Sequence, residues 1–139
     1  MLLSLAAAAC AVTIPAGHAD VAKGFNYGNA TIAVYLPKNG AVVGGRLASG
    51  GMQATLNPDG SISAKIGWWR AGTGRPRISG RRVDGAAPPL RAHVPAGYGR
   101  GFQATGLTFP TPGCWRVIGR YAGAQLAFTV RVTRSRLGP

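Results

Sequence analysis

Glycine and proline interrupt this sequence so often that long regular elements are disfavoured. The 139 residues include 22 Gly and 10 Pro, and Glu, a good helix former, does not occur. Because Gly and Pro weaken or break helix interiors, we expect short extended segments joined by many turns. This length, with 46% hydrophobic residues, fits one domain with a modest core.

Alternating apolar and polar residues predict strands. From Ser61 to Arg70, the even-numbered positions up to Trp68 are apolar and share one face, and the turn sequence at 57–60 links this segment to the strand before it. The candidate strands are 31–36, 52–56, 61–70, 77–79, 90–94, 102–109, 114–121 and 125–132. Seven or eight short strands without a helical insert predict an all-β fold, an antiparallel β-sandwich preceded by a signal segment.

The predicted core comes from the apolar faces of these strands. Leu126, Phe128, Val130 and Val132 share one face of the last strand, with polar or small residues on the other face. The expected core residues are Trp68, Trp115, Val117, Phe128 and Val130. The domain is expected to span 20–133, followed by a frayed basic tail over 134–139.

Residues 1–19 are typical of an export signal. An apolar run up to Ala9 is followed by Pro15 and by Gly17-His18-Ala19, so cleavage after Ala19 is expected to leave Asp20 as the first residue. A second interpretation takes Ala7-Ala8-Ala9-Cys10 as a loose lipoprotein box, with Cys10 lipidated and anchored to the envelope. Both place the protein outside the cytoplasm, in the periplasm or secreted. No apolar run reaches the roughly 20 residues of a transmembrane span.

Removal of residues up to Ala19 would leave Cys114 as the last thiol. No intramolecular disulfide could then form, and Cys114 is expected to be a small, partly buried hydrophobic residue.

Charge is the strongest compositional signal. Sixteen Lys and Arg face three Asp, which gives a net charge of +13, and all the charged residues follow Ala19. Such a surface attracts polyanions through salt-sensitive electrostatics. Arg outnumbers Lys thirteen to three, however, which is also what a GC-rich genome produces, and the two interpretations stay open.

A few side chains are candidates for binding. Strand alternation places Trp69 beside Lys65 on the outer face, where an indole next to a cation can stack on a sugar ring. The candidate binding residues are Lys65, Trp69, Arg70, Arg81 and Arg82. Asp84, one of few acids near these arginines, is expected to form a structural salt bridge.

The end of the chain resembles a known class of exported domain. The run from Gly101 through Gly113-Cys114-Trp115 to Val130 looks like the C-terminal half of immunoglobulin-like domains in bacterial secreted proteins and lipoproteins. With the 65–70 segment, it resembles bacterial extracytoplasmic proteins that carry a Gly-Cys-Trp motif. The resemblance implies an immunoglobulin-like sandwich and brings no activity with it.

An enzyme is the alternative. Cys114, with His93 and Asp84 upstream, is faintly similar to the motif of cysteine-dependent L,D-transpeptidases, in which a thiolate attacks an acyl donor. After Ala19 the single His, single Cys and three Asp favour neither a metal site nor a cofactor, and motifs for nucleotides or sequence-specific nucleic-acid binding are absent. The sequence therefore predicts a non-catalytic module that binds a polyanion, a glycan or an envelope protein. A structural domain without its own ligand is the remaining alternative.

Overall fold

The computed structural model describes residues 9–15, 21–48 and 50–139, and within them it is all-β, with ten strands and no helix. The strands are β1 (Tyr27–Gly28), β2 (Ile32–Val34), β3 (Ala41–Gly44), β4 (Met52–Leu56), β5 (Ile62–Arg70), β6 (Arg77–Arg82), β7 (Arg91–His93), β8 (Gly101–Phe109), β9 (Gly113–Tyr121) and β10 (Ala124–Arg134). The all-β prediction is confirmed. The predicted count of seven or eight is too low because the short strands β1 and β3 were missed.

The β4–β5 hairpin forms where the sequence predicts it. Asn57 donates its backbone N–H to the Ser61 carbonyl at 2.9 Å, and Gly60 closes the turn onto the Asn57 carbonyl at 2.9 Å. The Asp59 carboxylate accepts the backbone N–H of Ser61, which is the local bond that favours Asp in turns. Gly60 has φ +88°, a left-handed conformation that glycine adopts without strain.

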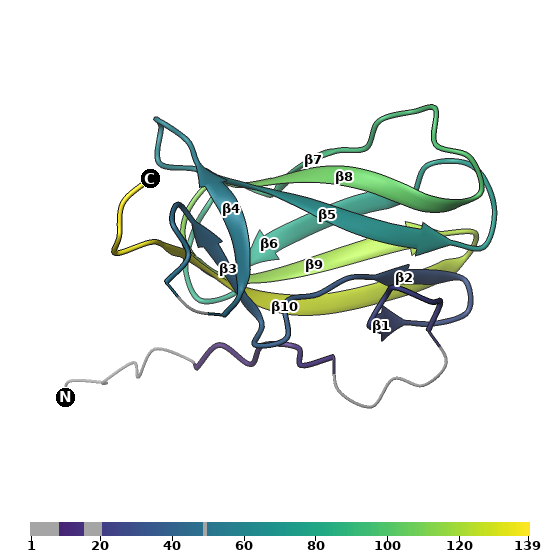
Figure 1. Ribbon diagram of the computed structural model, residues 1–139, viewed down its shortest axis with the longest axis horizontal. Helices are drawn as coiled ribbons and strands as arrows, with labels where there is room; N and C mark the ends of the chain where they lie inside the picture. The colour runs from purple at the N-terminus through teal and green to yellow at the C-terminus, as the bar shows by residue number, and fades with distance from the viewer. Residues whose placement is uncertain (1–8, 16–20, 49) are drawn as a thin grey trace.

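The strands form two layers (Figure 1). In one layer β5 pairs with β8 over nine residues, β7 pairs with the far edge of β8, and β2 and β4 pair with β5. In the other layer β6, β9, β10 and β3 follow one another, and β4 also pairs with β3, which joins the two layers. The arrangement is consistent with a β-sandwich. Most strand pairs are antiparallel, as expected, but β3 pairs in parallel with both β10 and β4.

The two layers pack through aromatic side chains. Trp68 of β5 meets Phe128 of β10 with ring centroids 5.8 Å apart, and Phe109 of β8 meets Trp115 of β9 at 5.6 Å. The predicted core residues Trp68, Trp115, Val117, Phe128 and Val130 are all at most 1% exposed. Gly119 lies under Trp68, and a Cβ there would stand 2.7 Å from the indole.

The segment 9–15 and the C-terminal residues contact the rest of the domain. The segment 9–15 runs beside β10 (Figure 1), where Thr13 and Thr129 exchange two hydrogen bonds of 2.9 Å. The basic tail was expected to be frayed, but Ser135 donates to the Gly44 carbonyl at 2.8 Å and the Gly138 carbonyl accepts from Arg46 at 3.0 Å. Pairing of β10 with β3 carries the tail onto the loop that follows β3, which explains the difference.

Within the described residues, no helix has the length and apolar character needed to cross a membrane.

Candidate functional site

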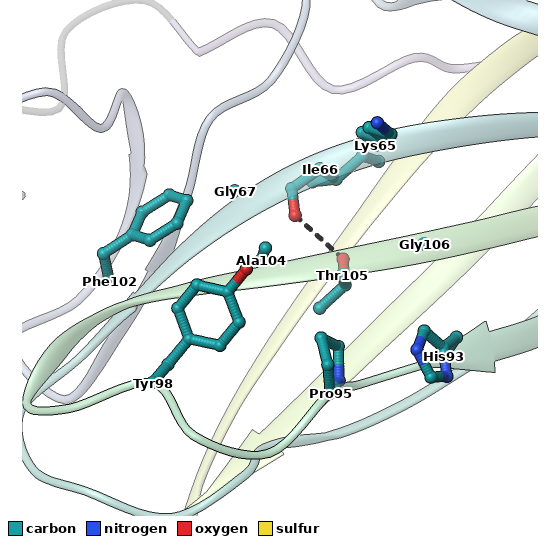
Figure 2. A pocket seen from close by; sticks show the side chains of 10 residues that line it. All are labelled: Lys65, Ile66, Gly67, His93, Pro95, Tyr98, Phe102, Ala104, Thr105 and Gly106. Carbon is teal, nitrogen blue, oxygen red and sulfur yellow. Dashed lines mark hydrogen bonds between the residues drawn. The ribbon is translucent and has the colours of Figure 1, made fainter.

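A pocket opens on the outer face of β5 and β8, which we call the aromatic pocket (Figure 2). Its volume is about 420 Å³, and its lining residues are Lys65, Ile66, Gly67, His93, Pro95, Tyr98, Phe102, Ala104, Thr105 and Gly106. Small residues of the two strands make its floor, the rings of Tyr98 and Phe102 stand at one end, and His93 stands at the other. The result is a shallow surface with an aromatic end and a cation, Lys65.

Strand register explains this arrangement. Gly67 pairs with Ala104 and Lys65 pairs with Gly106, so three of four outward positions have almost no side chain. Phe102, which is 51% exposed, leans over Gly67, and a Cβ at Gly67 would stand 3.0 Å from its ring. The missing side chains therefore create the hollow that Phe102 borders.

The aromatic end is held from inside the domain. Arg70 is 1% exposed and donates to the carbonyls of Tyr98 at 3.0 Å, Gly101 at 3.0 Å and Phe102 at 3.1 Å. It also donates to the carbonyl of Gly74. These donors face backbone, so Arg70, predicted from the sequence as a binding residue, acts here as a positioning residue for the pocket.

The two candidates on the outer face of β5, Lys65 and Trp69, differ in whether they line the pocket. Lys65 is exposed and lines the pocket, as the binding prediction requires. Trp69 points outward but is half-buried and lies across from Phe102, outside the pocket lining. Sequence reasoning missed Phe102 and Tyr98. The signal that could have found them is the glycine-rich stretch 97–101, which leaves two aromatic residues without an obvious core partner.

The opposite layer carries an unusual set of cations on its outer surface. In the pairing of β6 with β9, Arg77 lies directly opposite Arg120 and Arg81 lies directly opposite Arg116. All four side chains are exposed, and we call this surface the arginine face. Directly opposed residues are about 5 Å apart at their Cα atoms, and like charges in that position destabilise a sheet.

Among the described residues, no carboxylate side chain forms a salt bridge with the arginine face. The acids among the described residues are Asp59 and Asp84. Asp59 accepts hydrogen bonds from Ser61. Asp84 forms an ion pair with Arg82 at 2.8 Å and accepts the backbone N–H of Cys114 at 2.9 Å.

The Arg82–Asp84 pair confirms the predicted salt bridge. The hydrogen bond from Arg82, followed by that from the Cys114 N–H, lowers the pKa of Asp84 below its ordinary value. Gly113, at φ +142°, lets this pair lie against the backbone, since a Cβ there would stand 2.4 Å from Arg82. Arg82 is thus occupied, whereas Arg81, the other predicted cation of this segment, belongs to the arginine face.

Two further hollows connect the aromatic pocket with the arginine face. One, of about 690 Å³, shares His93 and Pro95 with the aromatic pocket and adds Arg75 and Arg77. The next, of about 670 Å³, shares Arg75 and Arg77 and adds Arg120. Because neighbouring hollows share lining residues, the three lie next to one another between an aromatic end and a cationic end.

Cys114 has a different role from the one that a nucleophile needs. Its sulfur is bonded to Cys10, and its side chain is 2% exposed. Cys114 was expected to have no disulfide partner if residues up to Ala19 are removed; in the chain that retains Cys10, it has one. His93 lies in the wall of the aromatic pocket.

The fold and these surfaces define a small all-β protein with a cationic and an aromatic surface. No family model matches the chain, and no curated protein or solved structure is significantly similar to it.

Proposed function

We propose that this chain is an extracytoplasmic, non-catalytic binding module for an anionic glycan. The proposal is carried by two directly opposed arginine pairs, Arg77 with Arg120 and Arg81 with Arg116, which no carboxylate side chain of the described residues neutralises. An arrangement that costs stability in the free protein is relieved when a bound anion screens it.

A polymer fits this geometry better than a single small anion. The two arginine pairs are four residues apart along β6, which corresponds to about 13 Å, so one phosphate or carboxylate cannot contact both. The adjacent hollows line the surface between these pairs and the aromatic pocket.

The aromatic end favours a polymer built of sugar rings. Phe102 and Tyr98 meet edge to face at 5.8 Å, and Phe102 presents exposed ring surface above a glycine floor. Apolar ring faces of this kind stack on the apolar face of a pyranose. An anionic glycan offers both rings and charges to one path.

An extracytoplasmic location is supported by the Cys10–Cys114 disulfide, since such bonds persist in oxidising compartments. The same bond occupies the sulfur that an L,D-transpeptidase mechanism would need as a thiolate. Among the two functions, the binding module is therefore the one that the geometry favours.

The test measures how the folded protein binds three polymers: alginate, polyphosphate and neutral dextran. The protein should bind alginate at low salt. The double variant Arg77→Gln with Arg120→Gln should reduce the magnitude of the slope of log affinity against log salt by roughly 1 to 2. The matched control, Arg46→Gln with Arg136→Gln, removes the same charge from two exposed positions outside the arginine face, one in the loop after β3 and one in the C-terminal segment.

Phe102→Ala then separates a glycan from any polyanion. It should weaken alginate binding and leave polyphosphate binding unchanged, because only the glycan has rings to stack. Equal effects of the two arginine double variants would refute the arginine face as the site. Binding of alginate and polyphosphate that is equally insensitive to Phe102→Ala would reduce the ligand to a generic polyanion.

A further inference from the structure

The segment before the domain is part of its structure. Cys10 and Cys114 are 104 residues apart in sequence, and the disulfide joins them with a Cα–Cα distance of 5.5 Å. Cys114 lies at the start of β9, which is flanked by β10 and β6, so the bond ties the segment 9–15 to an inner strand of one layer.

This segment makes contacts that a removable leader does not need. Thr13 donates its N–H to the Thr129 carbonyl, and the Thr129 N–H donates to Thr13 Oγ1, both at 2.9 Å. The two bonds satisfy one backbone donor and one backbone acceptor of β10, which the domain would otherwise leave to water. Val12 covers Gly40, where a Cβ would stand 2.5 Å from the Val12 side chain. The domain surface is thus shaped to accept residues 10–13.

Cleavage after Ala19 would remove all of these contacts. It would leave Cys114 as a buried thiol and would strip the Thr13 bonds from β10. The Gly17-His18-Ala19 sequence that predicts this cleavage lies outside the described residues. Lipidation at Cys10 conflicts with the structure in another way, because a thioether and a disulfide would use the same Sγ atom.

We propose that the exported protein is processed before Cys10, and that Cys10 remains in the mature chain as the disulfide partner of Cys114. Ala7 and Ala9 supply the small residues that a signal peptidase requires three and one positions before the cut. Hydrolysis of the Ala9–Cys10 bond consumes one water and leaves the Ala9 carboxylate and the Cys10 amine. The thiols of Cys10 and Cys114 then lose two protons and two electrons to an oxidant of the receiving compartment that carries a disulfide. The disulfide of the oxidant is reduced to two thiols, and the Sγ–Sγ bond forms.

The bond also gives the processing step a structural consequence. A chain cut before Cys10 keeps its first residue covalently fixed to β9, so its new N-terminus is held against the domain. The mature protein then has no free thiol among the described residues.

The test uses the exported protein recovered from envelope fractions and culture medium. After alkylation of free thiols and tryptic digestion without reductant, mass spectrometry should find the peptide 10–23 linked to the peptide 101–116. Reduction should separate the two. A mature N-terminus at Asp20 with alkylated Cys114, or a diacylglycerol on Cys10, would overturn the proposal.

Two variants provide a second measurement. Cys10→Ser and Cys114→Ser should each lower the midpoint of thermal unfolding, and the double variant should be no less stable than the weaker single variant, because either substitution removes the same bond. If Cys10→Ser leaves the midpoint of the exported protein unchanged while Cys114→Ser lowers it, Cys10 is not the partner. Should a variant fail to accumulate, the peptide map of the unaltered protein still decides.

Discussion

Replacing Trp68 by Ala tests whether the two layers are held together as described. The side chain is fully buried, packs against Phe128 and Gly119, and donates from Nε1 to Thr105 Oγ1 at 3.0 Å. Truncation of a buried tryptophan costs about 3 to 5 kcal/mol. The Thr105 hydroxyl keeps its own bond to the Ile66 carbonyl at 2.8 Å, so no buried donor is orphaned and the cost should stay within that range.

The expected shift is large compared with the whole stability of such a domain. At about 4 °C per kcal/mol for a chain of this size, the unfolding midpoint should fall by about 12 to 20 °C. Trp69→Ala is the matched control: the same residue type is removed one position along, where it is half-buried and outward, and we expect a loss of about 1 kcal/mol. Calorimetry or urea titration measures both. Equal losses in the two variants would refute the assignment of Trp68 to the core and Trp69 to the outer face.

Three other perturbations have defined outcomes. Reduction of the Cys10–Cys114 bond, which closes a loop over a separation of 104 residues, should lower the free energy of unfolding by about 4 to 5 kcal/mol. Urea titration with and without reductant measures this change, and the stability of the Cys10→Ser, Cys114→Ser double variant should not change with reductant. Asp84→Asn should destabilise the domain by about 1 kcal/mol near neutral pH. Because the folded pKa of Asp84 is lowered, the stability that its carboxylate contributes is present above the unfolded pKa of about 3.9 and is lost as the pH falls through the folded pKa. The free energies of unfolding of the unaltered protein and of Asp84→Asn should therefore converge in acid. A constant difference between them down to pH 2 would contradict this. Gly113→Ala should cost about 1 to 3 kcal/mol by thermal unfolding, since it meets Arg82 and adopts φ +142°, whereas Gly99→Ala, which meets nothing within 4 Å, should be neutral.

The parts of the fold that alternation and turn chemistry determine could be predicted from the sequence. The boundaries of β4 match the prediction, and β5 begins one residue later than expected, because the turn at 57–60 fixes both ends of the hairpin. Short strands were the failures. β3 has four residues and is defined by its parallel pairing with β10, which is distant in sequence, and with β4, so its own residues form no pattern that predicts a strand.

The candidate site divides in the same way. Lys65 and Arg81 could be placed on outer faces by counting along strands, whereas their neighbours required the register between strands. The opposition of Arg77 and Arg120 depends on pairing across 43 positions of sequence, which the chain does not reveal locally. Arg70 was predicted as a binding residue because a buried charge is not expected at the end of a strand, although alternation places position 70 on the inner face. The carbonyls of the nearby loop, which the sequence does not place beside Arg70, make its burial tolerable.

The positions of the arginines bear on whether the charge reflects codon usage alone. A bias toward Arg codons would scatter the residues without regard to one another, and a neutral surface would tend to avoid like charges directly across a ladder, since each such contact costs stability. Two of the six residue pairs between β6 and β9 are nevertheless Arg opposite Arg. The alginate-binding assay with the double variant Arg77→Gln, Arg120→Gln separates these explanations. Scattered charge predicts the same salt dependence of affinity for this variant and for Arg46→Gln with Arg136→Gln. A selected surface predicts a less steep salt dependence for the first variant alone.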